Sequence, residues 1–390
     1  MLTPKNSPRG QLMQKFVLAR IVRMDGIDIG LFDYDRHNAL YFFILNADEQ
    51  IYLRYGGRDA EDAMTYLNLE SLELALRAGL DRHELYSRGK LAKQQRPAPF
   101  YPEQITLLKK NELDRGRCVE CHLIADYQAQ EAELAGNLDR PRMLYPSPDL
   151  KTIGIHLDVP KGLVVEKAEG AAAKAGMQPG DTITEIGGVN VLTFGDLQYR
   201  YGKTDRNANR IELTIDRSGE RKNMSVELPA EWWLTDTSYR FWSVEPMLYF
   251  KTRPLTEEQK RRLNLPIRGF ASEVVEAVPP AGPNSAGSDT RILEQLQMLK
   301  PGDIITAVEG VQESRLTQNV ESYIKLTKKA GEPITLDLLR DGKQAQIKQN
   351  SYRLFYRKSD PSRNYGIPRR IKRNSYHLSY RISNPSRKNE

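Results

Sequence analysis

Apolar and polar positions alternate along two stretches of this chain in nearly the same order. In the first stretch, the apolar run Leu163, Val164 and Val165 follows Gly162, and an alanine-rich helix is predicted over residues 171–175. The tight turn Pro179-Gly180-Asp181 then leads into a predicted strand over residues 182–186. Further on, Ile211, Leu213 and Ile215 alternate with polar residues, turn at Ser218-Gly219 and return through Met224, Val226 and Leu228. This last pattern predicts a half-buried hairpin.

The second stretch repeats these features at matching positions. Pro301-Gly302-Asp303 again precedes an apolar strand over 304–308, and Ile334, Leu336 and Leu338 lead to a turn at Asp341-Gly342. Gly269, Phe270 and Ala271 take the place of the first apolar run. A Pro-, Gly- and Ser-rich insertion over 279–288 is specific to the second stretch and is interpreted as a surface loop. The sequence therefore predicts an internal repeat.

This order of elements resembles the PDZ domains of bacterial high-temperature-requirement proteases. In that family, a glycine loop holds the carboxylate of a peptide, and the next strand pairs with the peptide as an added strand. The resemblance implies that Gly162, Leu163, Val164 and Val165 bind peptide in the first copy. Gly269, Phe270 and Ala271 would do so in the second copy. A small β-barrel without a ligand is the alternative.

The first 97 residues predict a strand over 16–22, a hairpin over 40–45 and 50–55, and a helix with Leu69, Leu72, Leu76 and Leu80 near one face. This order resembles the back half of a thioredoxin-like domain in bacterial proteins that also carry PDZ modules. The front strands and the helix with the redox cysteine pair have no counterpart here. His37-Asn38-Ala39 stands where the family has a cis-proline. We therefore expect a partial thioredoxin-like domain without disulfide reductase activity.

The two cysteines of the chain stand in Cys118-Val119-Glu120-Cys121-His122, ahead of a predicted helix to about residue 135. Cys-x-x-Cys-His is the attachment signature of c-type haem, with the histidine as an axial ligand of the iron. Met143 or His156 is the candidate for the sixth ligand. Two other interpretations stay open, namely a thiol-disulfide or zinc site and an inert pair of helix cysteines. A redox partner is implied only by the first two of these three.

The basic character of the chain belongs to its tail. Residues 351–390 hold 11 Lys and Arg against 2 Asp and Glu, and the preceding 350 residues carry 47 against 49. The tail has little apolar periodicity, so we expect it to be disordered, with contact to a polyanion as its functional interpretation. No apolar run approaches the ~20 residues of a membrane helix. The first residues lack the apolar core of a signal peptide, so the sequence as given predicts the cytoplasm. A start further upstream with a signal peptide would place the protein in the periplasm or outside the cell.

The predicted fold class is a mixed α+β chain of several parts. In order, these are a partial thioredoxin-like domain (1–97), a helical segment with the Cys-x-x-Cys-His motif (98–148), a PDZ domain (149–230), an aromatic linker (231–266), a second PDZ domain (267–350) and the basic tail (351–390). Because no Ser-His-Asp constellation or Gly-x-Ser-x-Gly motif emerges, a protease is not expected. The leading hypothesis is an extracytoplasmic adaptor that binds protein C-termini or peptides and bears haem. The alternative is a redox protein that uses Cys118 and Cys121, with the PDZ domains as docking modules.

Overall fold

The computed structural model describes residues 4–38, 40–59, 62–234, 246, 248, 250–277, 299–314, 317, 319–329 and 331–350. The chain divides into a compact unit, Met1–Leu354, and a second unit, Phe355–Glu390, which lies outside the described residues. The predictions for the basic tail and for the insertion at 279–288 also fall outside them. Within the described part, no helix is both long and apolar enough to cross a membrane.

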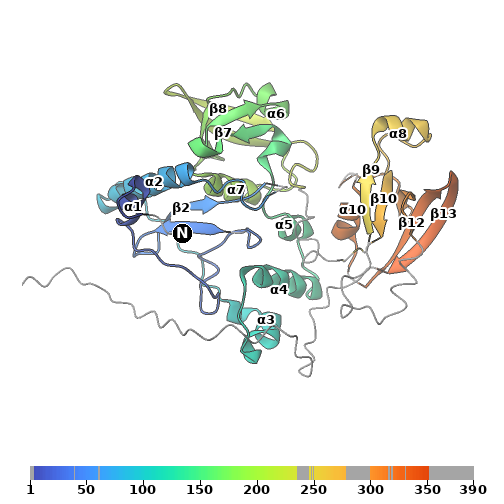
Figure 1. Ribbon diagram of the computed structural model, residues 1–390, viewed down its shortest axis with the longest axis horizontal. Coiled ribbons are helices and arrows are strands. Elements are labelled where there is room, and N and C mark those ends of the chain that lie inside the picture. Colours follow the sequence, from blue (N-terminus) through green and yellow to red (C-terminus); the bar gives the residue numbers. More distant parts are fainter. Residues whose placement is uncertain are drawn as a thin grey trace, which may run out of the picture. The chain divides into compact units, whose positions relative to one another are not determined.

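The N-terminal module is built around a two-stranded antiparallel hairpin (Figure 1). Strand β1 (Tyr41–Leu45) pairs with β2 (Ile51–Gly56), as predicted, and helices α1 (Pro8–Met13) and α2 (Leu69–Ser87) accompany it. The side chain of Asn46 accepts the N–H groups of Asp48 and Gln50, which fixes the turn between the strands. The apolar faces of the hairpin and the helices form one core: Leu12, Ile44, Leu53, Tyr55, Leu72, Ala75 and Leu76.

The prediction of a strand over residues 16–22 is wrong. These residues have no regular secondary structure, and Val17 and Val22 are 100% and 75% exposed. A strand needs a partner for its backbone groups, and the described sheet of this module consists of β1 and β2 alone. The apolar run therefore has β propensity without a neighbouring strand to pair with.

Short helices connect the N-terminal module to the first repeat. They are the 3-10 turns η1 (Pro102–Gln104) and η2 (Leu113–Arg115) and the helices α3 (Thr106–Asn111), α4 (Cys121–Leu134) and α5 (Arg140–Leu144). Helix α4 confirms the helix predicted after the Cys-x-x-Cys-His motif. Asp28 anchors an N-terminal loop to this segment, because its Oδ1 accepts the N–H of Phe100 at 3.0 Å.

The first repeat contains two small antiparallel sheets and one long helix. The pair β3 (Ile155–Leu157) and β4 (Val165–Ala168) forms one sheet, flanked by the 3-10 turns η3 (Leu150–Ile153) and η4 (Val159–Lys161). The other sheet has the order β6-β5-β7-β8. Its strands are β5 (Thr182–Ile186), β6 (Val189–Asn190), β7 (Arg210–Arg217) and β8 (Glu220–Glu227), and the helices are α6 (Gly170–Lys174) and α7 (Phe194–Lys203). The predicted strand and hairpin are confirmed here.

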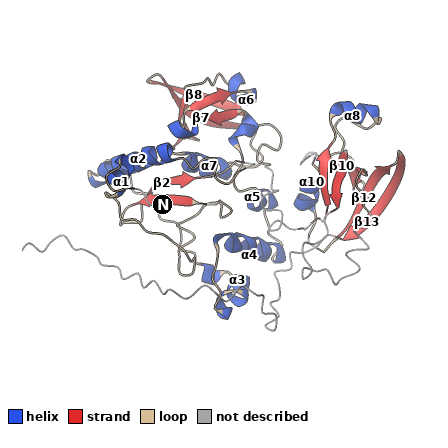
Figure 2. Ribbon diagram, in the orientation of Figure 1, coloured by secondary structure: helices blue, strands red, loops and turns tan. Residues whose placement is uncertain are grey.

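The second repeat forms one five-stranded sheet with the order β13-β12-β11-β10-β9 (Figure 2). Its strands are β9 (Phe250–Pro254), β10 (Ser272–Ala277), β11 (Ile304–Val308), β12 (Pro333–Arg340) and β13 (Lys343–Asn350), with helices α8 (Glu257–Arg262) and α10 (Val320–Thr327). Strand β9 and α8 both lie in the segment predicted as a linker over 231–266. This boundary needs correction, because β9 pairs with β10 and so belongs to the second repeat.

The two repeats share one arginine–aspartate contact at matching positions. Arg217 donates Nε and Nη2 to the two carboxylate oxygens of Asp181 at 2.6 and 2.8 Å, and Arg340 does the same to Asp303 at 2.7 Å for both bonds. Both aspartates belong to the Pro-Gly-Asp turns that the sequence had marked. Burial is the largest single influence and opposes ionisation of these two carboxyls. The arginine hydrogen bonds, a backbone N–H group and nearby positive charges together outweigh it and hold the pKa of Asp181 and Asp303 below the usual range.

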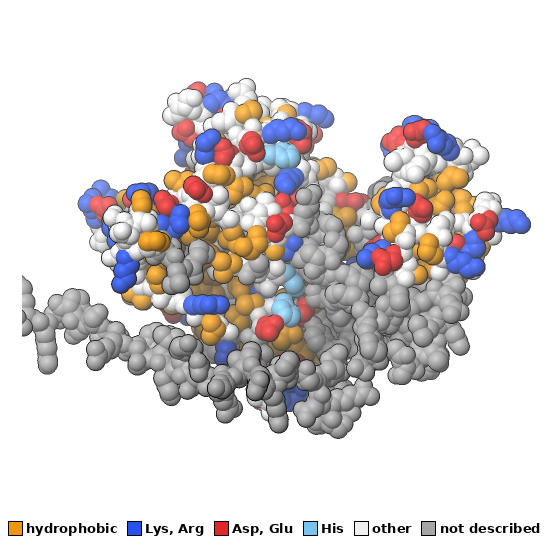
Figure 3. All heavy atoms as spheres, in the orientation of Figure 1, with side chains coloured by type: hydrophobic (Ala, Val, Ile, Leu, Met, Phe, Trp, Pro, Cys, Tyr) orange, Lys and Arg blue, Asp and Glu red, His pale blue; other side chains and the backbone are white. Residues whose placement is uncertain are grey.

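Two of the aromatic residues that follow the first repeat complete its core. Trp232 and Trp233 are 2% and 5% exposed, and the ring of Trp232 lies 4.7 Å from that of Tyr201 on α7. Tyr239, Phe241 and Trp242 lie outside the described residues. On the face shown in Figure 3, acidic and basic side chains are interspersed over the described surface, in keeping with the near balance of charge before residue 351.

Candidate functional site

The run predicted to accept a peptide strand lies between two neighbouring strands. Gly162 ends η4 with a φ of 78°, a left-handed conformation that favours glycine. The carbonyl of Leu163 accepts the N–H of Ile183 at 3.0 Å, and the N–H of Val165 donates to Asp181 at 2.8 Å. On the other side, the carbonyl of Val164 accepts the N–H of Asp158 at 2.8 Å, and Val165 pairs with Leu157 of β3. An incoming peptide strand would have to displace one of these neighbours.

Gly162 and Leu163 contribute instead to a cavity of about 270 Å³ at the junction of the first repeat and the N-terminal module. Leu74 of α2 and Phe194 of α7 form apolar parts of its wall. Lys161 also lines this cavity, and its ammonium group donates to Asp158 at 2.7 Å. The structure thus brings the predicted loop to a pocket, but as part of the wall rather than as a free strand edge.

Helix α7 of the first repeat is covered on both sides. Leu197 and Tyr201 are buried in the core of the repeat. On the opposite side, Asp196 accepts the backbone N–H of Arg54 in β2 at 2.9 Å. The guanidinium of Arg54 also lies 4.0 Å from the centre of the Tyr199 ring. Burial raises the pKa of the Asp196 carboxyl to about 6.

The predicted loop of the second repeat has its hydrogen-bonding groups already engaged. The N–H of Phe270 donates to Gln312 at 2.7 Å, and the carbonyl of Ala271 accepts the N–H of Leu255 at 2.8 Å. The carbonyl of Gly269 accepts from the ammonium group of Lys260 at 2.8 Å. Because burial disfavours the charged form, the pKa of Lys260 is lowered. A carboxylate-binding loop offers N–H donors, whereas this loop directs a carbonyl oxygen at a cation.

Strand β9 is an edge strand of the five-stranded sheet, and this is the feature that the sequence analysis missed. It pairs with β10 on one side, and from its other side the N–H of Thr252 donates to Oε1 of Glu321 on α10 at 2.5 Å. The hydroxyl of Thr252 donates to the same oxygen at 2.9 Å. The alternation of apolar Phe250 with polar Lys251 and Thr252 is a weak strand signal. It was overlooked because the many aromatic residues of the segment 231–266 led to its interpretation as a linker.

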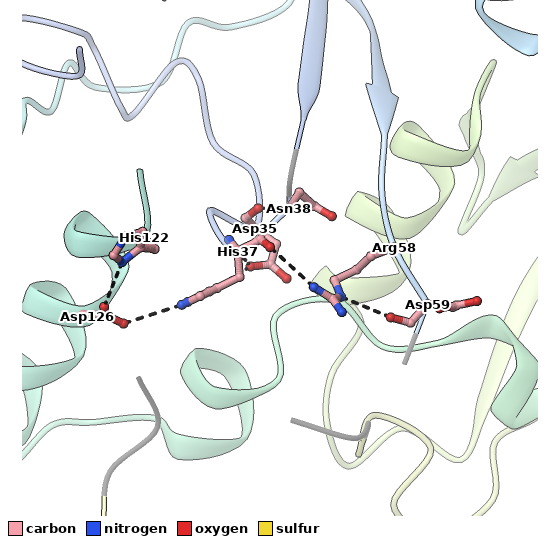
Figure 4. Close-up of polar contacts among 7 residues, drawn as sticks. All are labelled: Asp35, His37, Asn38, Arg58, Asp59, His122 and Asp126. Atoms are coloured by element: carbon pink, nitrogen blue, oxygen red, sulfur yellow. Dashed lines mark hydrogen bonds and ion pairs between the residues drawn. The ribbon is translucent and has the colours of Figure 1, made fainter. Parts of the chain in front are cut away.

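Cys118 and Cys121 are both free thiols at the start of α4. Cys118 is exposed, while Cys121 is half-buried and is the first residue of the helix. His122 follows, and its Nε2 lies 2.9 Å from a carboxylate oxygen of Glu120. Its Nδ1 lies 3.5 Å from Asp126, the contact drawn in Figure 4. The hydrogen bond to Asp126 and, after it, the contact with Glu120 raise the pKa of His122. The imidazole therefore binds a proton more readily than a free histidine does.

These surroundings do not fit the predicted haem. An axial histidine needs a ring nitrogen open to the iron, and a porphyrin needs an apolar surface. Here, the carboxylates of Glu120 and Asp126 face the two ring nitrogens of His122. The Asp126 carboxylate also contacts His37, whose Nε2 lies 3.5 Å away (Figure 4). Met143 is a half-buried residue of α5, and Nε2 of His156 contacts Glu169 at 2.8 Å. Across the described residues, no group of three or more His, Cys, Asp or Glu is arranged to hold a metal ion.

A profile of the PDZ domain family matches residues 164–203, which run from the end of the apolar run to the end of α7. The chain is also similar to proteins named probable periplasmic serine endoprotease DegP-like. The relative from Pseudomonas savastanoi pv. phaseolicola is 28% identical over 201 residues, which cover 49% of this chain and 38% of the relative. The relative from Hahella chejuensis is 26% identical over 197 residues, which cover 49% of this chain and 39% of the relative. A third relative, from Pseudomonas putida, is 36% identical over 76 residues, which cover 19% of this chain and 16% of the relative. The chain thus contains a PDZ domain and spans under two-fifths of the length of these relatives.

Proposed function

We propose that this protein is an extracytoplasmic adaptor whose second repeat is a PDZ domain that binds extended peptides along β9. The observation that carries this proposal is the edge position of β9, whose outward N–H at Thr252 meets only a side chain of α10 among the described residues. PDZ domains bind peptides by adding a strand to such an edge. The extracytoplasmic location is supported by the periplasmic relatives.

The geometry of β9 suits strand addition. Its pairing with β10 uses one side of the strand, from Phe250 opposite Ala277 to Pro254 opposite Ser272. The outward N–H of Thr252 donates to the carboxylate of Glu321, a half-buried side chain on α10, and not to another strand. A peptide carbonyl at the same position would replace Glu321 as the acceptor of the Thr252 N–H, while the Thr252 hydroxyl would exchange its bond to Glu321 for one to water.

The substitution Thr252→Pro tests this proposal. Proline removes the outward N–H and costs no bond to β10, so the repeat should stay folded. A library of random peptides with free C-termini should yield ligands for the full chain. Loss of one backbone hydrogen bond should weaken their binding by about tenfold.

Arg253→Ala is the matched control, because Arg253 is exposed and adjacent and its backbone is left intact. Its binding should stay near that of the unaltered chain. Equal affinities for Thr252→Pro and Arg253→Ala, with both proteins folded by circular dichroism, would rule out strand addition at β9.

A second candidate function is thiol-disulfide exchange at Cys118 and Cys121. The observation in its favour is an exposed thiol, Cys118, three residues before a second thiol, Cys121, at the N-terminus of α4. The Cys118 thiolate would attack a substrate disulfide, forming a mixed disulfide and releasing one substrate thiolate. Cys121 would then attack the Cys118 sulfur and release the second thiolate, so that two electrons pass from the cysteine pair to the substrate.

Trapping of the mixed disulfide tests the thiol proposal. With glutathione disulfide as the probe, Cys121→Ala should accumulate a glutathione adduct on Cys118, detected by intact mass. In the unaltered chain, Cys121 should displace glutathione from Cys118, so that a Cys118–Cys121 disulfide forms. If both proteins keep an adduct at Cys118 to the same extent, Cys121 does not resolve it and the proposal is wrong.

A further inference from the structure

We propose that the N-terminal module supplies an internal ligand to the first repeat between β3 and α7. In element order and pairing, β3 and α7 correspond to β9 and α10 of the second repeat, where we place peptide binding. We call Arg58, Asp59 and Tyr66 the clasp. This inference rests on the proposed function, because it assumes that both repeats descend from a peptide-binding arrangement. It assigns the clasp the role of closing the first repeat while the second stays accessible.

Arg58 is held by its backbone, as a residue of a bound peptide would be. Oε1 of Gln198 on α7 accepts the N–H of Arg58 at 3.2 Å, and Nε2 of the same amide donates to the Arg58 carbonyl at 2.7 Å. Gln198 is 3% exposed, so this paired bond is shielded from water. The preceding Gly57 has no room for a side chain, since a Cβ there would lie 2.7 Å from the ring of Phe194. The backbone therefore passes as close to α7 as it can.

Asp59 places a carboxylate at the entrance to β3. The ammonium group of Lys151, in η3 directly before β3, donates to Oδ2 of Asp59 at 2.9 Å. The side chain of Asp59 is 4% exposed and that of Lys151 is 37% exposed. The guanidinium of Arg58 donates hydrogen bonds to the backbone carbonyls of Asp59 and His37, which fixes the backbone at Asp59 (Figure 4). A carboxylate at a lysine beside a strand is also the group that a peptide C-terminus would bring.

Tyr66 fixes the other end of the clasp. Its ring stacks on that of Phe194, the first residue of α7, with 3.3 Å between the ring centres and 9° between the planes. Tyr66 is 4% exposed and belongs to the apolar core of the first repeat, although it comes from the N-terminal module. Burial, with Asp149 and Asp59 nearby, raises the pKa of its hydroxyl. The clasp thus touches α7 at Phe194 and Gln198 and the approach to β3 at Lys151.

A fluorescein-labelled peptide with the sequence of residues 57–68 tests the inference, with anisotropy as the readout. The full chain should bind it weakly, because the internal copy occupies the site in most molecules. Tyr66→Ala should bind it at least tenfold more tightly than the full chain does. Met64→Ala is the matched control, because Met64 is in the same segment and is 49% exposed, and it should behave like the unaltered chain.

Lys151→Ala locates the binding. Added to Tyr66→Ala, it should weaken binding of the labelled peptide about tenfold, because the aspartate of the peptide loses its lysine. Failure of folded Tyr66→Ala to bind the peptide overturns the inference, as does equal binding by the unaltered chain. If Tyr66→Ala does not fold, Asp59→Asn takes its place with the same expected direction.

The proposed function fails separately from this inference. Library peptides that bind through β9 should respond to Thr252→Pro and not to Tyr66→Ala. If Thr252→Pro leaves the affinity for the library peptides unchanged while Tyr66→Ala still binds the labelled peptide, the proposal for the second repeat is wrong. The inference about the clasp would then still hold.

Discussion

At the scale of single residues, Asp196 links the N-terminal module to the first repeat. Its carboxylate accepts the N–H groups of Arg54 and Leu192, and burial still raises its pKa to about 6. An unfolded chain would ionise this group at a pKa of about 3.9. The folded state therefore holds the proton more tightly than the unfolded state, and the stability that this provides is complete below about pH 4 and is lost as the pH rises towards about 6.

We expect the stability of the first repeat to fall by roughly 2 to 3 kcal/mol over this pH window from Asp196 alone. Trp232 and Trp233 lie in that core, so denaturant unfolding followed by tryptophan fluorescence reports it. Asp196→Asn should flatten the dependence between about pH 4 and pH 6. A dependence of unchanged steepness in this variant would show that other groups titrate there.

The duplicated Arg–Asp pairs give a second prediction at this scale. Asp181→Asn should destabilise the first repeat by about 1 to 3 kcal/mol, since it removes two charge-assisted hydrogen bonds from Arg217. Asp303→Asn should do the same to the second repeat and leave the transition seen by Trp232 and Trp233 in place. Because the pKa of both carboxyls is lowered in the folded state, the effect of each substitution should shrink as the pH falls below about 4. Identical shifts of the fluorescence transition in the two variants would contradict independent repeats.

At the scale of elements, the sequence predicted those whose signal is local. Strands β7 and β8 show a strict alternation because one face of the hairpin is buried, and α2 shows a helical spacing of leucines. The peptide-accepting edge could not be found this way. Gly162 and Gly269 look alike in sequence, but which strand edge is unpaired depends on how β3 and β9 pair with β4 and β10, and the local sequence pattern does not show this pairing. The same reason explains the failed strand over 16–22.

That apolar run gives a prediction about surface rather than core. Val17→Thr combined with Leu18→Lys should change the thermal midpoint little, because these side chains are 100% and 62% exposed. The double variant should bind less of a dye that reports exposed apolar surface. By contrast, Ile29→Ala should cost about 2 to 5 kcal/mol, since Ile29 is 3% exposed. A double variant as unstable as Ile29→Ala would show that the run is packed in solution.

At the scale of the whole molecule, charge is divided along the chain. Removal of residues 351–390 would change the formal charge from +7 to −2, as 47 Lys and Arg then face 49 Asp and Glu. We expect the shortened chain to lose retention on heparin resin at neutral pH, because the tail carries the basic excess. The full chain is the control. Retention that survives the truncation would locate the polyanion contact in the part before residue 351.

The clasp also sets a threshold for any molecule that competes with it. A tethered ligand acts at an effective concentration in the millimolar range, however dilute the protein is. If the clasp is closed in about 99 of 100 molecules, a competitor at the first repeat binds with an apparent affinity about a hundredfold below its intrinsic value. Weak, abundant peptides would then reach the second repeat alone. Only a partner that binds strongly enough to pull Tyr66 from Phe194 would engage both repeats, and that event would also loosen α2, whose N-cap Asn68 lies two residues further along the chain.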